Sequence, residues 1–393
     1  MKFEAMQALY GDCLLVTFKG DNGDVRMLVD GGPKTVYETT LKPFLTKLRK
    51  GLDKSTPLIL DAVMVSHIDE DHIFGILQLF NELGDLKEKK APFPWKPRWL
   101  LYNSFDDLVG ENAGGTARVV GGETVLAALG GGTLLFDGDP PSEDTLKILE
   151  SYPQGNALSD AAVKIGVTRN PPQQAPLMLE KTPRVLRLGN AHLTVVGPPK
   201  KEVEILRERW RQWKAKKKPS ATIPGFSRDL DNTVTNLSSI VVHVREGKRS
   251  MLLCGDAQGN LIVDGLVDAK LLDGNGKIAV DLLKVPHHGS IRNFTPRLAD
   301  AVVADHYVFS ADGSYANPDR ATLDLLEKTR PNGGYSVHLT YPATQCDDKH
   351  AADLAKNGKT LDRKKDGIAV VIKRWREGGL VKVEEGPVSL EFK

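Results

Sequence analysis

The sequence predicts an α/β protein in which β-sheets pack face to face as a sandwich. Apolar strand signals alternate along the chain with the periodicity of amphipathic helices. Polar residues also recur directly after predicted strands, at Asp30, His67, Asp256 and His287. Side chains at the ends of distant strands can converge on one edge of such a sandwich, and a functional site is expected there.

The N-terminal part alternates strands with helices. A turn at 21–24, rich in Asp, Asn and Gly, joins the first two strands. Apolar residues at positions 73, 76, 77 and 80 share one helix face. The predicted elements are strands at 14–18, 25–29 and 62–65, helices at 36–50 and 72–83, and a strand at 99–102 after a Pro- and Trp-rich loop from 91.

The rest of the chain is predicted to complete a single domain, 1–393. Segment 105–180, rich in Gly and Pro, is expected to form loops and short helices that are inserted into the domain or decorate it. It could be a lid, a partner surface or a solvated connection. Further strands are predicted at 185–188, 192–196, 239–244, 250–254 and 280–285.

Composition limits the classes of function. The 393 residues are 40% apolar and 26% charged with a net charge of +2, so no global attraction to nucleic acid or membrane is expected. No apolar run is long enough to span a bilayer, and the first residues do not resemble a signal peptide. We expect a cytoplasmic protein that keeps Cys13, Cys254 and Cys346 as reduced thiols.

The strongest functional signal is a run of metal-binding residue types between residues 66 and 72. His67, Asp69, Asp71 and His72 lie where the chain turns from a strand into a helix. An aspartate at a helix start can also cap free N–H groups, but capping accounts for only one of the two carboxylates. We therefore interpret the run as a metal-binding loop.

Two later strand ends extend this set. Asp256 follows one strand, and His287 and His288 follow another. With the loop they supply three carboxylates and up to four imidazoles, enough for two metal ions with open positions. Two divalent ions and three aspartates leave a charge of +1, which favours anionic substrates. The oxygen-rich set shifts the preference from zinc toward manganese without excluding zinc.

These motifs resemble the metallo-β-lactamase superfamily, whose first motif is His-x-His-x-Asp-His, with Asp69 in place of the second His. The resemblance is closer to the soluble hydrolase domain of ComEC-type DNA-internalisation competence proteins, which favours Ser-His-x-Asp-x-Asp-His. It runs in order through most of the chain, except 105–180. The matching segments are 11–16, 28–32, 66–72, 236–242, 253–256 and 283–290.

The resemblance implies an αββα sandwich: two face-to-face mixed sheets, helices outside, and one sheet from each half of the chain. It implies that His67 and Asp69 hold a first metal ion. Asp71, His72 and one of His287 or His288 would hold a second, with Asp256 bridging the two. Asp30 would orient the metal loop, and Asn236 would be a weak ligand or a substrate contact.

The chain departs from that family near Asn317, which stands where a Gly-His-Pro motif places a histidine. An asparagine can donate a hydrogen bond but cannot act as a general acid, so turnover could be slower or the substrate different. No membrane-channel segment accompanies the domain, so DNA uptake is not implied. Ser290 and Asn317 are predicted to contact the substrate or support the site.

The leading functional hypothesis is hydrolysis of a phosphodiester, with a single-strand nuclease as the first candidate. Asp71 or Asp256 would accept the proton of the attacking water. A cyclic-nucleotide or small-molecule phosphodiesterase is the near alternative. A lactone, thioester or amide hydrolase is a second class, and a non-enzymatic module that keeps metal for stability is a third.

Segment 200–218 is a candidate nucleic-acid contact. Nine Lys or Arg against three Glu leave it with +6, and Leu206, Trp210 and Trp213 share one helix face. Cations on phosphates with Trp on bases would suit single-stranded nucleic acid. The alternative is an amphipathic surface helix whose tryptophans pack on the sandwich.

Overall fold

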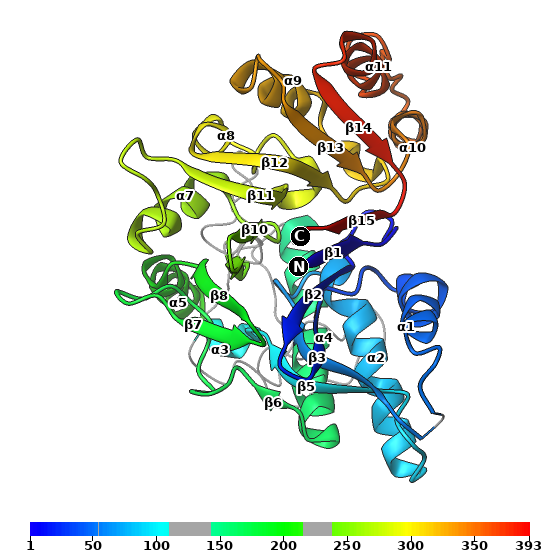
Figure 1. The fold of residues 1–393 in the computed structure, drawn as a ribbon, viewed down its shortest axis with the longest axis vertical. Helices are drawn as coiled ribbons and strands as arrows, with labels where there is room; N and C mark the ends of the chain where they lie inside the picture. Colours follow the sequence, from blue (N-terminus) through cyan, green and yellow to red (C-terminus); the bar gives the residue numbers. More distant parts are fainter. Residues whose placement is uncertain (54, 110–142, 215–237) are drawn as a thin grey trace.

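The computed structural model describes residues 1–53, 55–109, 143–214 and 238–393, and within them two β-sheets lie face to face (Figure 1). Helices cover the outer face of each sheet. This is the αββα sandwich predicted from the sequence. Among the described residues, none of the helices combines the length and the apolarity that crossing a membrane requires.

The first sheet has the strand order β15-β1-β2-β3-β4-β5-β6. Strands β2 and β3 form the predicted hairpin, in which Gly20 pairs with Gly23 across the turn. The strands are β1 (Lys2–Ala5), β2 (Leu14–Gly20), β3 (Gly23–Val29), β4 (Leu58–Met64), β5 (Trp95–Leu101), β6 (Thr168–Arg169) and β15 (Val388–Glu391).

The second sheet has the order β14-β13-β12-β11-β10-β9-β8-β7. Strands β10 to β14 run parallel, so the carboxyl ends of β10 and β11 meet at one edge. The strands are β7 (Val185–Leu188), β8 (Ala191–Gly197), β9 (Val241–Glu246), β10 (Arg249–Leu253), β11 (Ile278–Lys284), β12 (Val302–Phe309), β13 (Tyr335–Leu339) and β14 (Val381–Glu385).

The helices form two outer layers. The first sheet is covered by α1 (Lys42–Leu48), α2 (Glu70–Glu88) and α4 (Glu143–Ile165). The second is covered by α7 (Gly259–Asp268), α8 (Pro296–Ala301), α9 (Arg320–Thr329), α10 (Ala343–Lys356) and α11 (Ala369–Gly378). Single turns lie at η1 (Tyr37–Leu41), η3 (Pro286–Gly289) and η4 (Ser314–Ala316), and α3 (Phe105–Val109) and α5 (Lys200–Lys214) pack on each other.

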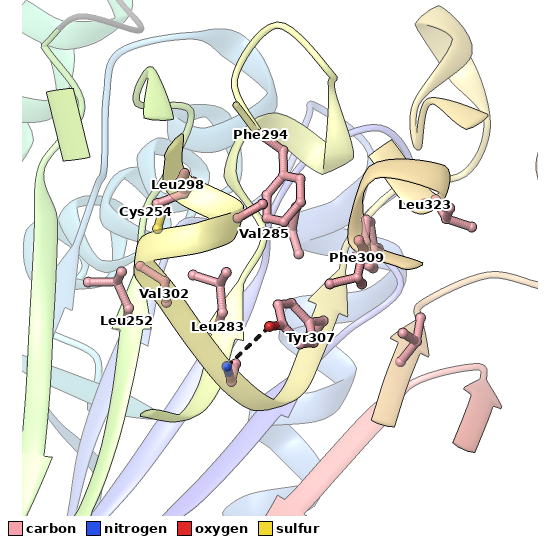
Figure 2. Packing of buried hydrophobic residues seen from close by; sticks show 14 of the residues in the cluster. Leu252, Cys254, Leu283, Val285, Phe294, Leu298, Val302, Tyr307, Phe309 and Leu323 are labelled. Atoms are coloured by element: carbon pink, nitrogen blue, oxygen red, sulfur yellow. Dashed lines mark hydrogen bonds between the residues drawn. The ribbon is translucent and has the colours of Figure 1, made fainter. Parts of the chain in front are cut away.

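The alternation of side chains along each strand builds the layers. In β10, Met251 and Leu253 face the core between the sheets, whereas Leu252, and Cys254 directly after the strand, face the outer helices. Figure 2 shows these outward residues packed among the side chains of β11, β12 and α8. Cys254 is therefore a core thiol, and burial raises its pKa to about 12. All three cysteines are free and buried.

The two halves of the chain do not supply one sheet each throughout. The last strand, β15, returns to the first sheet and pairs with β1. The backbone N–H of Phe392 donates to the carbonyl oxygen of Met1, so the two chain ends lie together. Without β15, the outer edge of β1 would expose unpaired backbone N–H and C=O groups; β15 forms hydrogen bonds with them.

Two predicted segments differ from the structure. Strand β5 begins at Trp95, inside the predicted loop, and includes Pro97. Proline fits there because β6 pairs only with Trp99 and Leu100, so among the described residues Pro97 has no strand on that side of β5. A residue without an N–H donor is tolerated at such an edge. Segment 105–180 contains a helix of 23 residues, α4, instead of only short helices. Its Leu158 is buried in the same cluster as the apolar face of α2.

Candidate metal centre

The loop between β4 and α2 carries the first candidate ligands. Ser66 and His67 follow β4, and α2 begins at Glu70 with Asp69 at its N-cap position. The Asp69 carboxylate makes no capping hydrogen bond; one of its oxygens lies 3.5 Å from His67 Nε2. Asp69 thus occupies the N-cap position without acting as a side-chain cap.

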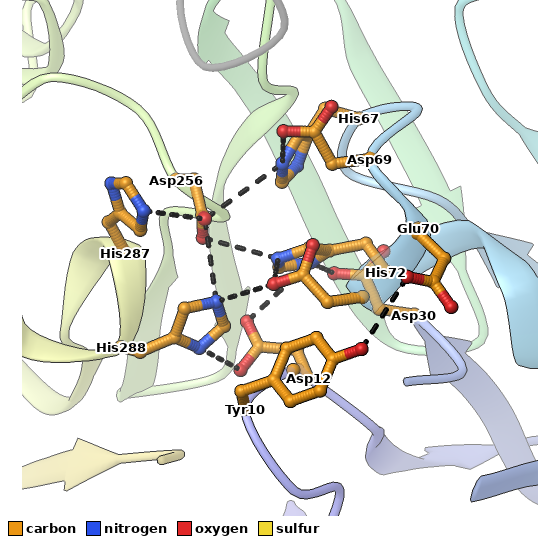
Figure 3. Close-up of polar contacts among 12 residues, drawn as sticks. Tyr10, Asp12, Asp30, His67, Asp69, Glu70, His72, Asp256, His287 and His288 are labelled. Carbon is orange, nitrogen blue, oxygen red and sulfur yellow. Dashed lines mark hydrogen bonds and ion pairs between the residues drawn. The ribbon is translucent and has the colours of Figure 1, made fainter. Parts of the chain in front are cut away.

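Asp256 lies at the centre of a converging group of side chains (Figure 3). Its Oδ1 is 3.4 Å from His72 Nε2, and its Oδ2 is 3.4 Å from His288 Nε2. Its Oδ2 also lies 3.6 Å from His287 Nε2 and 3.9 Å from His67 Nε2. The ends of β4, β10 and β11 thus meet at one edge of the sandwich.

Two compact sets of ligand atoms share Asp71. One set is Asp71, His72, Asp256 and His288, whose ligand atoms all lie within 4.8 Å of one another. Within it, His288 Nε2 is 3.2 Å from Asp71 Oδ2. The other set is His67, Asp69 and Asp71. Of the two adjacent histidines, His288 belongs to a compact set, whereas His287 approaches the centre through Asp256 Oδ2, 3.6 Å from its Nε2.

Hydrogen bonds on the far side of each ring decide which nitrogen faces the centre. His288 Nδ1 lies 2.8 Å from the Ser310 carbonyl oxygen, which can only accept, so Nδ1 carries the proton. His287 Nδ1 lies 2.9 Å from the Asn293 side-chain oxygen, whose amide group in turn donates to the Asp256 carbonyl. Both rings therefore direct Nε2 toward Asp256, and in the neutral ring that atom carries the lone pair.

Ser66 and Asp30 orient the other two imidazoles in the same sense. The Ser66 hydroxyl donates to Asp30 Oδ2 at 2.8 Å, so it accepts from His67 Nδ1 at 3.1 Å. His72 Nδ1 lies 2.9 Å from Asp30 Oδ2 and donates to it. Asp30 Oδ1 also accepts from the Ser66 N–H at 2.7 Å. Asp30 thus supports the loop from behind, and all four rings direct Nε2 inward.

The inward atoms lack hydrogen-bond partners although they are buried. Among the described residues, these include one atom each of His67, Asp69, His72, Asp256 and His288: three imidazole Nε2 atoms and two carboxylate oxygens. A buried polar atom without a partner is costly, and such atoms are rare in folded proteins. Divalent cations satisfy them, so the residues present fit a metal centre.

The backbone bends to bring the adjacent histidines into place. His287 and His288 adopt φ of 47° and 55°, in the left-handed region that is unfavourable for residues with a Cβ. Gly289 follows at φ 92°, and a Cβ there would approach the Phe309 ring. Strained backbone of this kind clusters at functional sites, where the surrounding structure holds it.

A buried ion pair lies behind the centre. Asp12 and Lys284 are each 1% exposed, and the Lys284 ammonium contacts Asp12 Oδ2. Asp12 Oδ1 lies 3.6 Å from His288 Nδ1. A Cβ at Gly11 would collide with the Asp71 carbonyl, so glycine lets the loop that carries Asp12, just before β2, reach the metal loop.

The clustered carboxylates and imidazoles of the centre shift one another's pKa values. Burial opposes the charge on Asp256, but His288, His72 and His287 outweigh burial and hold the pKa of that carboxyl well below its usual range. Burial likewise opposes protonation of His72, but Asp256, Asp71 and Asp30 raise its pKa well above the usual value. Asp256 therefore stays ionised at neutral pH, as a metal ligand must, and a bound ion would displace the proton from His72.

The remaining predicted site residues lie in different places. Ser290 is buried, and its N–H donates to the His287 carbonyl, so it closes the histidine turn. Asn317 is half-buried and follows the η4 turn, and its neighbour Pro318 would meet a Cβ at Gly289. Asn236 lies outside the described residues.

The basic segment 200–218 is described in part. Residues 200–214 form α5, whereas 215–218 and the side chains of Leu206, Trp210 and Trp213 lie outside the description. Two of its cations have intramolecular partners. Arg207 donates to the Leu108 and Asp107 carbonyls, and Lys200 pairs with Glu180. The Arg207 contacts anchor α5 on α3, and Glu180 offsets the charge of Lys200.

The sequence interpretation missed several residues that support the centre. Asp12 and Lys284 stand in recognisable motifs but carry no sign in the sequence that they form a pair. Asn293 and Ser310 position His287 and His288 from a loop and from the end of β12. Ser310 acts through its carbonyl oxygen, which every residue type possesses, so no sequence signal could have revealed it.

No protein-family model matches the sequence, and no curated protein matches it. Zn(2+)-bound PqqB from Methylobacterium extorquens aligns over 100% of both chains, with 10% identity and a TM-score of 0.39. CmlA, a diiron β-hydroxylase from Streptomyces venezuelae, aligns with a TM-score of 0.33 and 11% identity, covering 100% of this chain and 54% of that one. MIM-2 metallo-β-lactamase aligns with a TM-score of 0.28 and 15% identity, covering 73% and 77%.

Proposed function

We propose that this chain is a metallo-hydrolase that binds two divalent ions, manganese or zinc, and cleaves phosphodiester bonds, with single-stranded nucleic acid as the substrate class. The observation that supports it is the set of five buried ligand atoms, from three histidines and two aspartates, that face one another without hydrogen-bond partners. Bound cations would satisfy these atoms, and two adjacent cations suit phosphoryl chemistry.

The ligand assignment follows the two compact sets. Asp71, His72, His288 and Asp256 would hold one ion, and His67 and Asp69 would hold the other. Asp256 would be shared, since its carboxylate faces His67 as well as His72. His287, whose side chain is 24% exposed, would join the ligands of the ion that His288 holds, or it would contact the substrate.

The chain's own residues would orient the substrate and accept a proton. The bound ions would supply positive charge for the phosphate and an acidified water. Asp71, whose side chain is 20% exposed, is the candidate proton acceptor, with Asp256 as the other. The half-buried Asn317 could donate a hydrogen bond to a phosphate oxygen, but it cannot supply a leaving-group proton.

The charge balance favours a phosphodiester over a neutral substrate. Two divalent ions against Asp69, Asp71 and Asp256 leave +1, which attracts an anion. The basic segment 200–218 would bind the phosphates of a longer strand, and its exposed Lys201 is a described residue that could do so.

The test measures metal content and cleavage together. The protein is loaded with manganese or zinc and assayed on labelled single-stranded DNA, cyclic mononucleotides, a bis-aryl phosphate and an acyl ester. Asp71→Ala should lose metal and at least about a hundredfold of phosphodiester turnover. Asp85→Asn, an exposed change on the same helix, should retain both.

The other outcomes are decisive as well. Cleavage of acyl esters with none of any phosphodiester would replace the proposal with an acyl hydrolase. Cleavage of cyclic nucleotides but not DNA would retain the phosphodiesterase and remove the nuclease. Stoichiometric metal without turnover of any substrate, and a melting temperature that falls in Asp71→Ala, would identify a structural metal site.

A further inference from the structure

Tyr10 stands directly beside the candidate metal centre (Figure 3). Its hydroxyl lies 3.5 Å from Oε2 of Glu70, the residue that separates the candidate ligands Asp69 and Asp71 in the sequence. Two residues after it, the Asp12 N–H donates to the Asp71 carbonyl at 3.3 Å. The close approach of Gly11 to that carbonyl fixes the position of this segment. Tyr10 is therefore held at the rim of the centre.

Tyr315 comes to the same place from the other sheet. Its ring packs edge-on against Tyr10, with centroids 5.6 Å apart and an interplanar angle of 82°. The loop that carries it is held firmly. The Ser314 N–H donates to Asp312 Oδ1 at 2.9 Å, and Pro318 lies against Gly289, the residue after His288. Both sides of the centre thus contribute one tyrosine.

The exposed side chain and the left-handed backbone of Tyr315 both cost free energy in the folded state, so stability does not explain them. Its side chain is 68% exposed, among the most exposed of the large apolar residues described. Tyr315 and Ala316 have φ of 56° and 68°, so two successive residues with a Cβ adopt the left-handed region. Strained backbone that presents an exposed aromatic ring beside a reactive centre indicates a role in binding.

We propose that Tyr10 and Tyr315 form a substrate subsite that stacks a planar ring, a nucleobase, next to the phosphodiester being cleaved. Tyr10, edge-on to Tyr315 and in contact with Glu70, would hold the outer ring in place. The exposed surface of Tyr315 would stack on the base, because every nucleobase offers a π-face to an aromatic side chain. This subsite rests on the proposed phosphodiesterase function and gives its substrate class.

The experiment compares two phosphodiesters with the same leaving group: thymidine 5′-(p-nitrophenyl) phosphate and methyl p-nitrophenyl phosphate. The readout is the ratio of their kcat/KM values on the metal-loaded protein. Tyr315→Ala should lower this preference for the nucleoside about tenfold, chiefly through KM, which corresponds to about 1.4 kcal/mol. Tyr315→Phe should retain the preference, and so should Val163→Ala, an exposed apolar control on α4.

Binding separates failure of the subsite from failure of the hydrolase. Equilibrium dialysis compares thymidine 5′-monophosphate with methyl phosphate on the same proteins. If neither diester is cleaved but Tyr315→Ala weakens nucleotide binding, the subsite stands and the hydrolase proposal falls. An unchanged ratio in Tyr315→Ala, or equal binding of the two phosphates to the unaltered protein, overturns the subsite.

Discussion

His288 Nδ1 lies 2.8 Å from the carbonyl oxygen of Ser310, a residue 22 positions further along the chain. Because a carbonyl oxygen only accepts hydrogen bonds, this contact leaves the lone pair on Nε2. That atom lies 3.2 Å from Asp71 and 3.4 Å from Asp256. At the other three histidines, too, Nδ1 contacts an oxygen outside the centre and Nε2 points inward. These hydrogen bonds orient the four rings before any metal binds.

The Ser66 hydroxyl is expected to tune metal affinity, because it accepts from His67 and donates to Asp30. Ser66→Ala should weaken metal binding about 10–100-fold, the usual effect of removing a group that orients a ligand. Competition with a chromophoric chelator measures this. Ser389→Ala, an exposed serine on β15, is the control. Equal affinities in Ser66→Ala and the unaltered protein would contradict the role of the hydroxyl.

Metal removal should destabilise the fold, since the ions bind the folded chain and neutralise its three clustered aspartates. At a hundredfold excess over the dissociation constant, one ion contributes about 2.7 kcal/mol. A chelator should therefore lower the melting temperature, and added manganese or zinc should restore it. Asp71→Ala should respond much less, and Asp85→Asn should respond like the unaltered protein. A melting temperature indifferent to chelator would argue against bound metal.

The buried pair of Asp12 and Lys284 should matter for stability more than a surface ion pair does. Lys284→Met leaves the Asp12 carboxylate buried and uncompensated, at a cost of about 3–5 kcal/mol in the free energy of unfolding. Adding Asp12→Asn should recover part of the loss. Urea unfolding of both single variants and the double variant measures the coupling. Additive losses would show that the two side chains do not interact.

His243 is expected to make the protein sensitive to acid. Burial, helped by Arg245, lowers its pKa to about 4. The unfolded chain, with a His pKa of about 6.5, therefore binds the proton first, and stability falls as the pH drops from about 6.5 to about 4. This contribution is at most about 3 kcal/mol. The unfolding free energy should depend less on pH in His243→Gln between pH 7.5 and 4.5; identical profiles would count against a neutral buried ring.

Much of the fold could be predicted because it depends on local pattern. Alternating apolar residues in β2 place Leu14 and Val16 between the sheets and Leu15 on the outer side. The helical spacing of Ile73, Ile76 and Phe80 likewise predicts the buried face of α2. The return of β15 to the first sheet could not be predicted, since pairing with a sheet edge depends on where that edge lies in space.

The sequence by itself determined the residue types of the centre and their places at strand ends, because the two-residue and 3.6-residue periods show where each strand stops and each helix starts. Only the tertiary structure decided which imidazole joins which set, that Asn293 and Ser310 orient two of the rings, and that Lys284 lies against Asp12. These contacts join groups brought together by packing from distant parts of the chain. Their geometry is a property of the assembled sandwich, and no local pattern encodes it.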